Sequence, residues 1–193
     1  ISTCSGLSAI STAILSVINS GEHALFPDSL YGSSRHFVKT LLKDFGVEVE
    51  FYPPRTNGRI SEHFKTNTRL LYLESPGSLT FEVQDVPTMS KLARSHNIVT
   101  ICDDTWGTAL HYPVLALGAD IVVEAATKYI AGHSDVNLGI AAANGKIGKK
   151  LKSTAGALGI CAGPEDLYLG LRGLRTMRLR LEPVSYTHLR AHE

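Results

Sequence analysis

The sequence predicts an α/β protein with a mainly parallel sheet flanked by helices. Short apolar runs rich in β-branched residues alternate with longer segments whose apolar residues recur every three or four positions. Runs such as LLYL and IVVE are continuously apolar, as parallel strands buried on both faces should be. This alternation predicts repeated βαβ units. The predicted strands are residues 23–26, 47–52, 70–73, 98–102, 121–123 and 138–142, and the predicted helices include residues 6–19, 31–45 and 86–95.

Composition and charge favour a globular protein that acts on a small molecule. The 193 residues are 44% hydrophobic, and 19 Lys and Arg residues balance 18 Asp and Glu residues. No net field therefore favours nucleic acid, and no apolar run is long enough to cross a bilayer. We expect a cytoplasmic protein with no nucleic-acid or membrane partner. The 3 cysteines lack CxxC spacing, which argues against a disulfide framework or a zinc site and predicts buried thiols.

The two ends of the chain predict a piece of a longer protein. The chain starts at Ile1, and its first residues already resemble the entrance to a helix. A regular apolar pattern over residues 167–181 stops at Pro183, and the last ten letters, VSYTHLRAHE, show no apolar period. They resemble translated sequencing-adapter sequence. We predict one partial domain over residues 1–183 and a non-native tail over residues 184–193, with a native loop as the alternative.

Residues that carry chemistry are expected just after the predicted strands, because open parallel sheets bind ligands beyond the carboxyl ends of their strands. The segments there are ESPGS at 74–78, DDTW at 103–106 and ATK at 126–128. Asp103 and Asp104 end a buried strand, where an ionised carboxylate needs a cation or a strong donor. A pyridinium N–H is such a partner. A carboxylate that caps the following turn is the alternative.

Three further features suit a cofactor with a phosphate and a carbonyl. Lys128 follows a strand among small residues, and a lysine in a small, partly desolvated pocket can lose its proton and attack a carbonyl. Tyr31 offers an aromatic face to a cofactor ring, or else packs in the core. The run STCSGLS at residues 2–8 opens a helix, where free N–H groups suit a phosphate, although a simple N-cap explains it too.

Together these motifs resemble the Cys/Met-metabolism family of pyridoxal-phosphate enzymes, in order and spacing, up to about Pro183. The resemblance implies the aspartate-aminotransferase-like fold (fold type I), of which this chain would supply most of the large cofactor domain, truncated at both ends. The ESPGS and AATKY motifs are similar to the bacterial cystathionine β-lyase branch. The motifs are CSGL at 4–7, YG at 31–32, ESPGS at 74–78, DDTW at 103–106, AATKY at 125–129, GHSD at 132–135 and LRGLRT at 171–176.

The resemblance implies a role for six residues. Lys128 matches the lysine that carries pyridoxal 5′-phosphate as a Schiff base, Asp103 the partner of the pyridine nitrogen, and Tyr31 the tyrosine stacked on the ring. These three are the predicted catalytic residues. Backbone N–H groups at the helix entrance and one threonine hydroxyl match the phosphate site. The predicted cofactor-binding residues are Gly6, Leu7, Tyr31, Asp103, Thr127 and Lys128.

The sequence departs from the family pattern at two of its motifs. Ala125 stands where many relatives have a serine, so one hydroxyl to the phosphate would be absent. Asp104 stands where this branch often has asparagine, a change that the sequence does not explain. The family's carboxylate-binding arginine belongs to a C-terminal domain outside this chain. A tyrosine and an arginine lent to the neighbouring subunit would precede Ile1.

The implied reaction is β-elimination of L-cystathionine to homocysteine, pyruvate and ammonia, in methionine biosynthesis and transsulfuration, by a homotetramer built from dimers. Lys128 would serve as both anchor and base. Alternatives within the family are a cystathionine γ-lyase, a γ-synthase, a methionine γ-lyase or a sulfhydrylase. An inactive or regulatory fragment is another alternative. A nicotinamide-dependent oxidoreductase is disfavoured, because no GxGxxG follows a strand.

Overall fold

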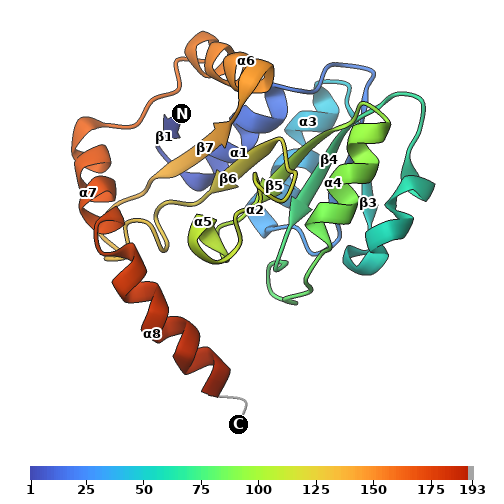
Figure 1. Ribbon diagram of the computed structural model, residues 1–193. Helices are drawn as coiled ribbons and strands as arrows, with labels where there is room; N and C mark the ends of the chain where they lie inside the picture. The colour runs from blue at the N-terminus through green and yellow to red at the C-terminus, as the bar shows by residue number, and fades with distance from the viewer. Residues whose placement is uncertain (191–193) are drawn as a thin grey trace.

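A seven-stranded sheet runs through the middle of the molecule, with helices on both of its faces (Figure 1). The computed structural model describes residues 1–190, with side chains as far as residue 184. The strand order is β1-β7-β6-β5-β4-β2-β3; the pairs β1–β7 and β6–β7 are antiparallel and the others are parallel. The strands are β1 (Ser2–Thr3), β2 (His23–Pro27), β3 (Glu48–Tyr52), β4 (Thr68–Glu74), β5 (Val99–Asp103), β6 (Ile121–Glu124) and β7 (Gly139–Ala143).

Two apolar layers, one on each face of the sheet, form the core. In β4, Leu70 and Tyr72 pack in one layer, Leu71 and Leu73 pack in the other, and all four are fully buried. Burial of each leucine stabilises the fold by about 1.5–3 kcal/mol, which explains why the strand is apolar throughout. The first layer contains residues of α1 (Gly6–Leu15), α2 (Gly32–Lys39), α3 (Leu41–Asp44) and α6 (Gly145–Ala157), and the second those of the 3₁₀ segment η1 (Pro54–His63) and α4 (Val86–Ser95).

The last two long helices pack on the segment that follows β6. Met177 and Leu181 form a third apolar cluster with residues of that segment, including Ile130. The Arg180 guanidinium donates to the backbone oxygens of Ile130 at 3.1 Å and Gly173 at 2.8 Å. Beyond this contact the C-terminal helix extends away from the sheet (Figure 1). The remaining helices are α5 (Thr108–His111), α7 (Pro164–Leu174) and α8 (Met177–Arg190).

The α/β class and the six predicted strands are confirmed, whereas several predicted helix boundaries are wrong. The helix predicted over residues 31–45 breaks at Thr40, and the pattern over residues 167–181 divides into α7 and α8. The expected stop at Pro183 is also wrong, because α8 continues through Pro183 to Arg190. The side chains of residues 185–190 and all of residues 191–193 lie outside the described part, so the non-native tail stays a prediction.

The thiol prediction holds for one cysteine of three. Cys102 is buried in the second layer, whereas Cys4 and Cys161 are exposed, because both lie in connecting segments outside the core. All three thiols are free. Within residues 1–190, none of the helices is both long enough and apolar enough to cross a membrane.

Close packing at Gly173 predicts a stability effect. A Cβ there would lie 2.2 Å from the oxygen of Ala131 and 2.4 Å from that of Ile130, so Gly173→Ala should lower the free energy of unfolding by about 2 kcal/mol. Gly156→Ala is the matched control. Nothing lies within 4 Å of a Cβ at Gly156 in α6, so alanine there should raise stability by about 0.5 kcal/mol. Denaturant unfolding of the full-length protein measures both; equal effects would contradict the packing.

Candidate active site

A cleft of about 1550 Å³ opens at the carboxyl edge of the parallel strands. Its volume exceeds the roughly 300–1000 Å³ of most small-ligand sites, so it has room for a cofactor together with a substrate. Residues from α8, including Leu179 and Pro183, stand on one side of it. The structure therefore brings together residues that are far apart in the sequence. All six predicted cofactor-binding residues line this cleft: Gly6, Leu7, Tyr31, Asp103, Thr127 and Lys128.

The first turn of α1 faces the cleft. Ser5 caps the helix, because its Oγ accepts the N–H of Ser8 at 3.1 Å and its carbonyl accepts the N–H of Ala9 at 3.1 Å. The N–H groups of Gly6 and Leu7 precede any intrahelical acceptor and so suit an anion. A Cβ at Gly6 would lie 2.7 Å from that of Ala125, so glycine lets the helix start close to the end of β6. The N-cap and the anion site are therefore compatible.

Thr127 holds the backbone beside this helix entrance. Its hydroxyl oxygen accepts the N–H of Leu138 at 2.8 Å. The one hydroxyl proton has two acceptors within reach, Leu138 O and Asn137 Oδ1, each at 3.1 Å. To accept a hydrogen bond from this hydroxyl, a phosphate would have to replace both of these acceptors. The structure thus gives Thr127 a structural role in addition to the predicted one.

Asp103 ends β5 and is only 8% exposed. Its Oδ1 accepts the N–H of Thr105 at 3.0 Å and the Thr105 hydroxyl at 2.6 Å, so the turn-capping alternative is observed. The Thr105 hydroxyl in turn accepts the N–H of Ala125 at 2.8 Å, which links this carboxylate to the segment that carries Lys128. Burial raises the pKa of Asp103 above its ordinary value. A cation in the cleft would stabilise the ionised form.

Lys128 and Tyr31 are the most accessible of the predicted residues. Lys128 lies in the turn after β6, where its N–H donates to Ala125 O at 2.9 Å, and its side chain is exposed. The expectation that Lys128 is partly desolvated is therefore wrong. The described residues leave its side chain open to solvent. Tyr31 caps the start of α2 and is 46% exposed, so the alternative of a core tyrosine is excluded.

Four buried carboxylates gather around this edge of the sheet. Burial, assisted by the charge of Asp103, raises the pKa of Glu74 to about 7 and that of Glu124 to about 7. Burial, then the charges of Glu124 and Asp103, raise the pKa of Asp104 to about 8. Among the described residues, neither oxygen of Asp104 has a hydrogen-bond partner. The environment of Asp104 therefore favours its neutral, protonated form. A protonated carboxyl group is similar in shape and charge to the asparagine side chain that this branch often has at this position.

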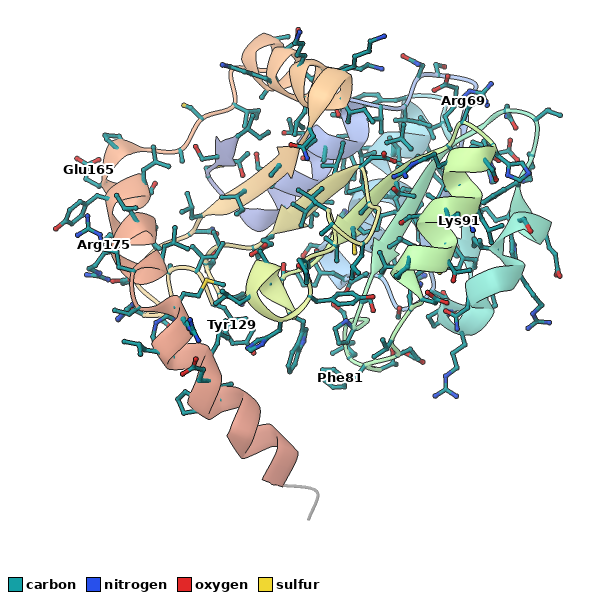
Figure 2. All side chains as sticks on the ribbon, in the orientation of Figure 1. Arg69, Phe81, Lys91, Tyr129, Glu165 and Arg175 are labelled. Carbon is teal, nitrogen blue, oxygen red and sulfur yellow. The ribbon has the colours of Figure 1, made fainter. Side chains whose placement is uncertain are left out.

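An aromatic row lies along the same edge of the molecule. The ring of Phe81 meets that of Trp106 edge to face at 5.5 Å between centroids, and Trp106 meets Tyr129 at 6.3 Å. Figure 2 shows Phe81 and Tyr129 below the sheet in this view. Trp106 and Tyr129 also line the cleft. Each edge-to-face pair of this kind stabilises the folded state by about 0.5–1.5 kcal/mol.

Sequence reasoning gave no role to several residues that build the cleft. Glu74 bonds to both Tyr31 and Ser78, and Thr105 bonds to Asp103. One signal was present in the sequence, since Glu74 directly follows a continuously apolar strand, as Asp103 does. The partners of Glu74 lie in two different loops, which the sequence alone does not bring together.

Comparison with known proteins gives one family over nearly the whole chain. The model of the Cys/Met metabolism PLP-dependent enzymes matches residues 1–190. A Rhizobium johnstonii protein provisionally named cystathionine β-lyase is 48% identical over 178 residues, 92% of this chain and 45% of that protein. An L-alanine/L-glutamate racemase of Wolbachia pipientis is 40% identical over 178 residues, 92% of this chain and 44% of that protein.

A solved structure shows the same fold. The cystathionine γ-lyase of Lactobacillus plantarum, complexed with L-serine, matches with a TM-score of 0.88 and 28% identity, over 93% of this chain and 47% of that one. The predicted fold of the pyridoxal-phosphate lyases is thereby confirmed. The chain spans about half the length of the curated relatives it matches.

The buried carboxylates predict how stability depends on pH. Asp104 has a folded pKa of about 8 against 3.8 in the unfolded chain, and Glu74 one of about 7 against 4.5. Between these values the folded state binds more protons. For these two groups the free energy of unfolding is therefore greatest below about pH 4. It falls as the pH rises toward about 7 to 8, by up to about 1.4 kcal/mol per pH unit for each group, and levels off above the folded pKa values.

Asp104→Asn tests this assignment. The variant should lose part of the fall between pH 5 and pH 9 and should be more stable than the parent at pH 9, because it buries no charge there. Denaturant unfolding across this range measures the effect. A variant with the parent's pH dependence would show that Asp104 does not bind the proton.

Proposed function

Because the chain belongs to the Cys/Met metabolism PLP-dependent enzymes, we propose that the full protein is a carbon–sulfur lyase that cleaves L-cystathionine by β-elimination. The products would be homocysteine, pyruvate and ammonia. The observation that supports this best is the meeting of Lys128, Asp103 and Tyr31 at one cleft beside the first turn of α1. The ESPGS and AATKY motifs favour this branch of the family over the others.

The residues of the cleft fit pyridoxal phosphate. The N–H groups of Gly6 and Leu7 in the first turn of α1 would hold the phosphate. Glycine is needed at position 6, because a Cβ there would clash with Ala125 and push the start of the helix away. Asp103, buried and fixed through Oδ1 by Thr105, would accept the N–H of the pyridine ring. The Tyr31 ring would cover one face of the cofactor. The Lys128 amine would provide the point of attachment.

The cofactor, when bound, supplies an electron sink for the Cα carbanion. The chain supplies proton transfer and orientation. When the amine of the substrate replaces Lys128 at the cofactor, the freed Lys128 Nζ would take the Cα proton of the amino-acid substrate. The Cβ–S bond would then break, and the sulfur would leave with the electron pair and take a proton from the lysine. Asp103, kept ionised by the positive charge opposite it, holds the ring nitrogen protonated. Water completes the reaction by releasing ammonia from the three-carbon product, which becomes pyruvate.

Two neighbouring reactions have specific support and can be told apart by their products. Similarity to a cystathionine γ-lyase structure favours γ-elimination as the second candidate, which would give 2-oxobutyrate in place of pyruvate from cystathionine. Similarity to an alanine and glutamate racemase favours removal of the Cα proton without elimination. That reaction would give D-alanine from L-alanine and no keto acid. Incubation of the full-length protein with cystathionine and with L-alanine separates the three.

Assembly and location also belong to this proposal. We propose a homotetramer built from dimers, because residues lent by a neighbouring subunit are part of the site that the family resemblance implies. The substrate is a small amino acid, and the near balance of charge favours neither nucleic acid nor membrane as a partner. We propose a cytoplasmic location as well.

Two substitutions test the roles of the central residues. Lys128→Ala should abolish both the visible absorbance of lysine-bound pyridoxal phosphate and the release of pyruvate, because attachment and base are lost together. Asp103→Ala should still bind the cofactor at Lys128, but should slow elimination on the order of 100-fold, because the ring nitrogen loses its partner.

The exposed Lys91 on α4, labelled in Figure 2, provides the matched control. Lys91→Ala should keep the absorbance and the rate of the parent. Absorbance spectra and a coupled pyruvate assay on the full-length protein measure all three variants. If Lys128→Ala still turned over cystathionine at the parent rate, the assignment would be wrong.

A further inference from the structure

A buried carboxylate that no step of the proposed reaction uses joins two walls of the cleft. Glu74 ends β4 and is 5% exposed. Its Oε2 accepts the N–H of Tyr31 at 2.9 Å. Its Oε1 accepts the N–H of Ser78 at 2.8 Å and the Ser78 hydroxyl at 2.5 Å. Tyr31 follows β2 whereas Ser78 follows β4, so one side chain ties two loops together, and all three residues line the cleft.

Glu74 is itself held by a buried network. Its N–H donates to Gln84 Oε1 at 3.0 Å, and Gln84 Nε2 donates to the Tyr52 hydroxyl at 3.1 Å. The Tyr52 hydroxyl donates to the backbone oxygen of Tyr72 at 2.8 Å. Gln84, Tyr52 and Tyr72 are at most 1% exposed. The carboxylate therefore projects into the cleft from a strand end that buried hydrogen bonds hold in place.

We infer that Glu74 is a positioning residue that fixes the loops of Tyr31 and Ser78 beside the cofactor site. The inference rests on the proposed function, in which the Tyr31 ring covers the cofactor. Three donors converge on Glu74, and only a carboxylate presents acceptors on both of its sides. A glutamine would turn an N–H₂ group toward either Tyr31 N–H or the two donors of Ser78, so one loop would lose its tie.

A second carboxylate offers a matched control. Glu124 is 6% exposed at the end of β6, and its pKa, like that of Glu74, is raised by burial and by the charge of Asp103. Unlike Glu74, it does not line the cleft. Glu124→Gln therefore removes a similar charge near Asp103 without untying either loop. Any effect of Glu74→Gln beyond that of Glu124→Gln reports positioning.

The test compares Glu74→Gln, Glu74→Asp and Glu124→Gln in the full-length protein. Without cofactor, at a pH above about 8 where Glu74 is ionised, hydrogen exchange of the segment that contains Tyr31 should speed up about tenfold in both Glu74 variants, because a hydrogen bond to a charged group is lost or weakened. With cofactor, the dissociation constant for pyridoxal phosphate should rise about tenfold, and the visible circular dichroism of the bound ring should change. Glu124→Gln should match the parent in all three measurements.

The outcomes separate this inference from the proposed function. If the parent binds pyridoxal phosphate but both Glu74 variants match Glu124→Gln, the positioning role is wrong and the proposed function stands. If the parent binds no pyridoxal phosphate, both are overturned. Where Glu74→Gln does not fold, Glu74→Asp decides, because it keeps the charge but has a shorter reach; parent-like exchange and cofactor binding in that variant overturn the inference.

Discussion

The parallel alignment of β4, β5 and β6 is the constraint on which the site depends. It brings the ends of three strands to one edge, and each strand ends in a carboxylate: Glu74, Asp103 and Glu124. All three are at most 8% exposed, and buried carboxylates resist ionisation unless donors or cations meet them. Asp103 lines the cleft and is therefore the carboxylate beside which a positively charged ring nitrogen would be stabilised.

Hydrogen bonds divide these carboxylates between two tasks. Glu74 is satisfied by protein donors from two loops, which makes it a structural tie. Asp103 receives its protein donors at Oδ1, both from Thr105, which orients the group while it faces the cleft. Thr105 also accepts the N–H of Ala125, so the strand that carries the acid and the segment that carries Lys128 are fixed to each other. Thr105 thus adds a direct tie between the acid and the lysine segment to the pairing of β5 with β6.

The sequence could predict the residues that follow strands better than the contacts between loops. Asp103 and Lys128 could be found because each follows an apolar run in a parallel sheet, where position alone indicates the ligand edge. Strand β1 could not be predicted, because its two residues are too few to show a hydrophobic pattern and they pair with β7, which is distant in the sequence. The exposure of Lys128 was mispredicted, because small neighbours in sequence do not show which elements cover a side chain. The contacts of α7 and α8 with Ile130 and Ala131, close to the break between the two helices, likewise join segments that are far apart in the sequence.

The central claim is that Lys128 holds pyridoxal phosphate, and borohydride reduction tests it without any mutation. Reduction of the full-length protein after incubation with the cofactor makes a lysine-bound group permanent, and peptide mass spectrometry then locates it. The account predicts one modified site, in the peptide that contains Ala126, Thr127 and Lys128. A label spread over exposed lysines such as Lys91, or a cofactor that is fixed at another single lysine, would contradict it.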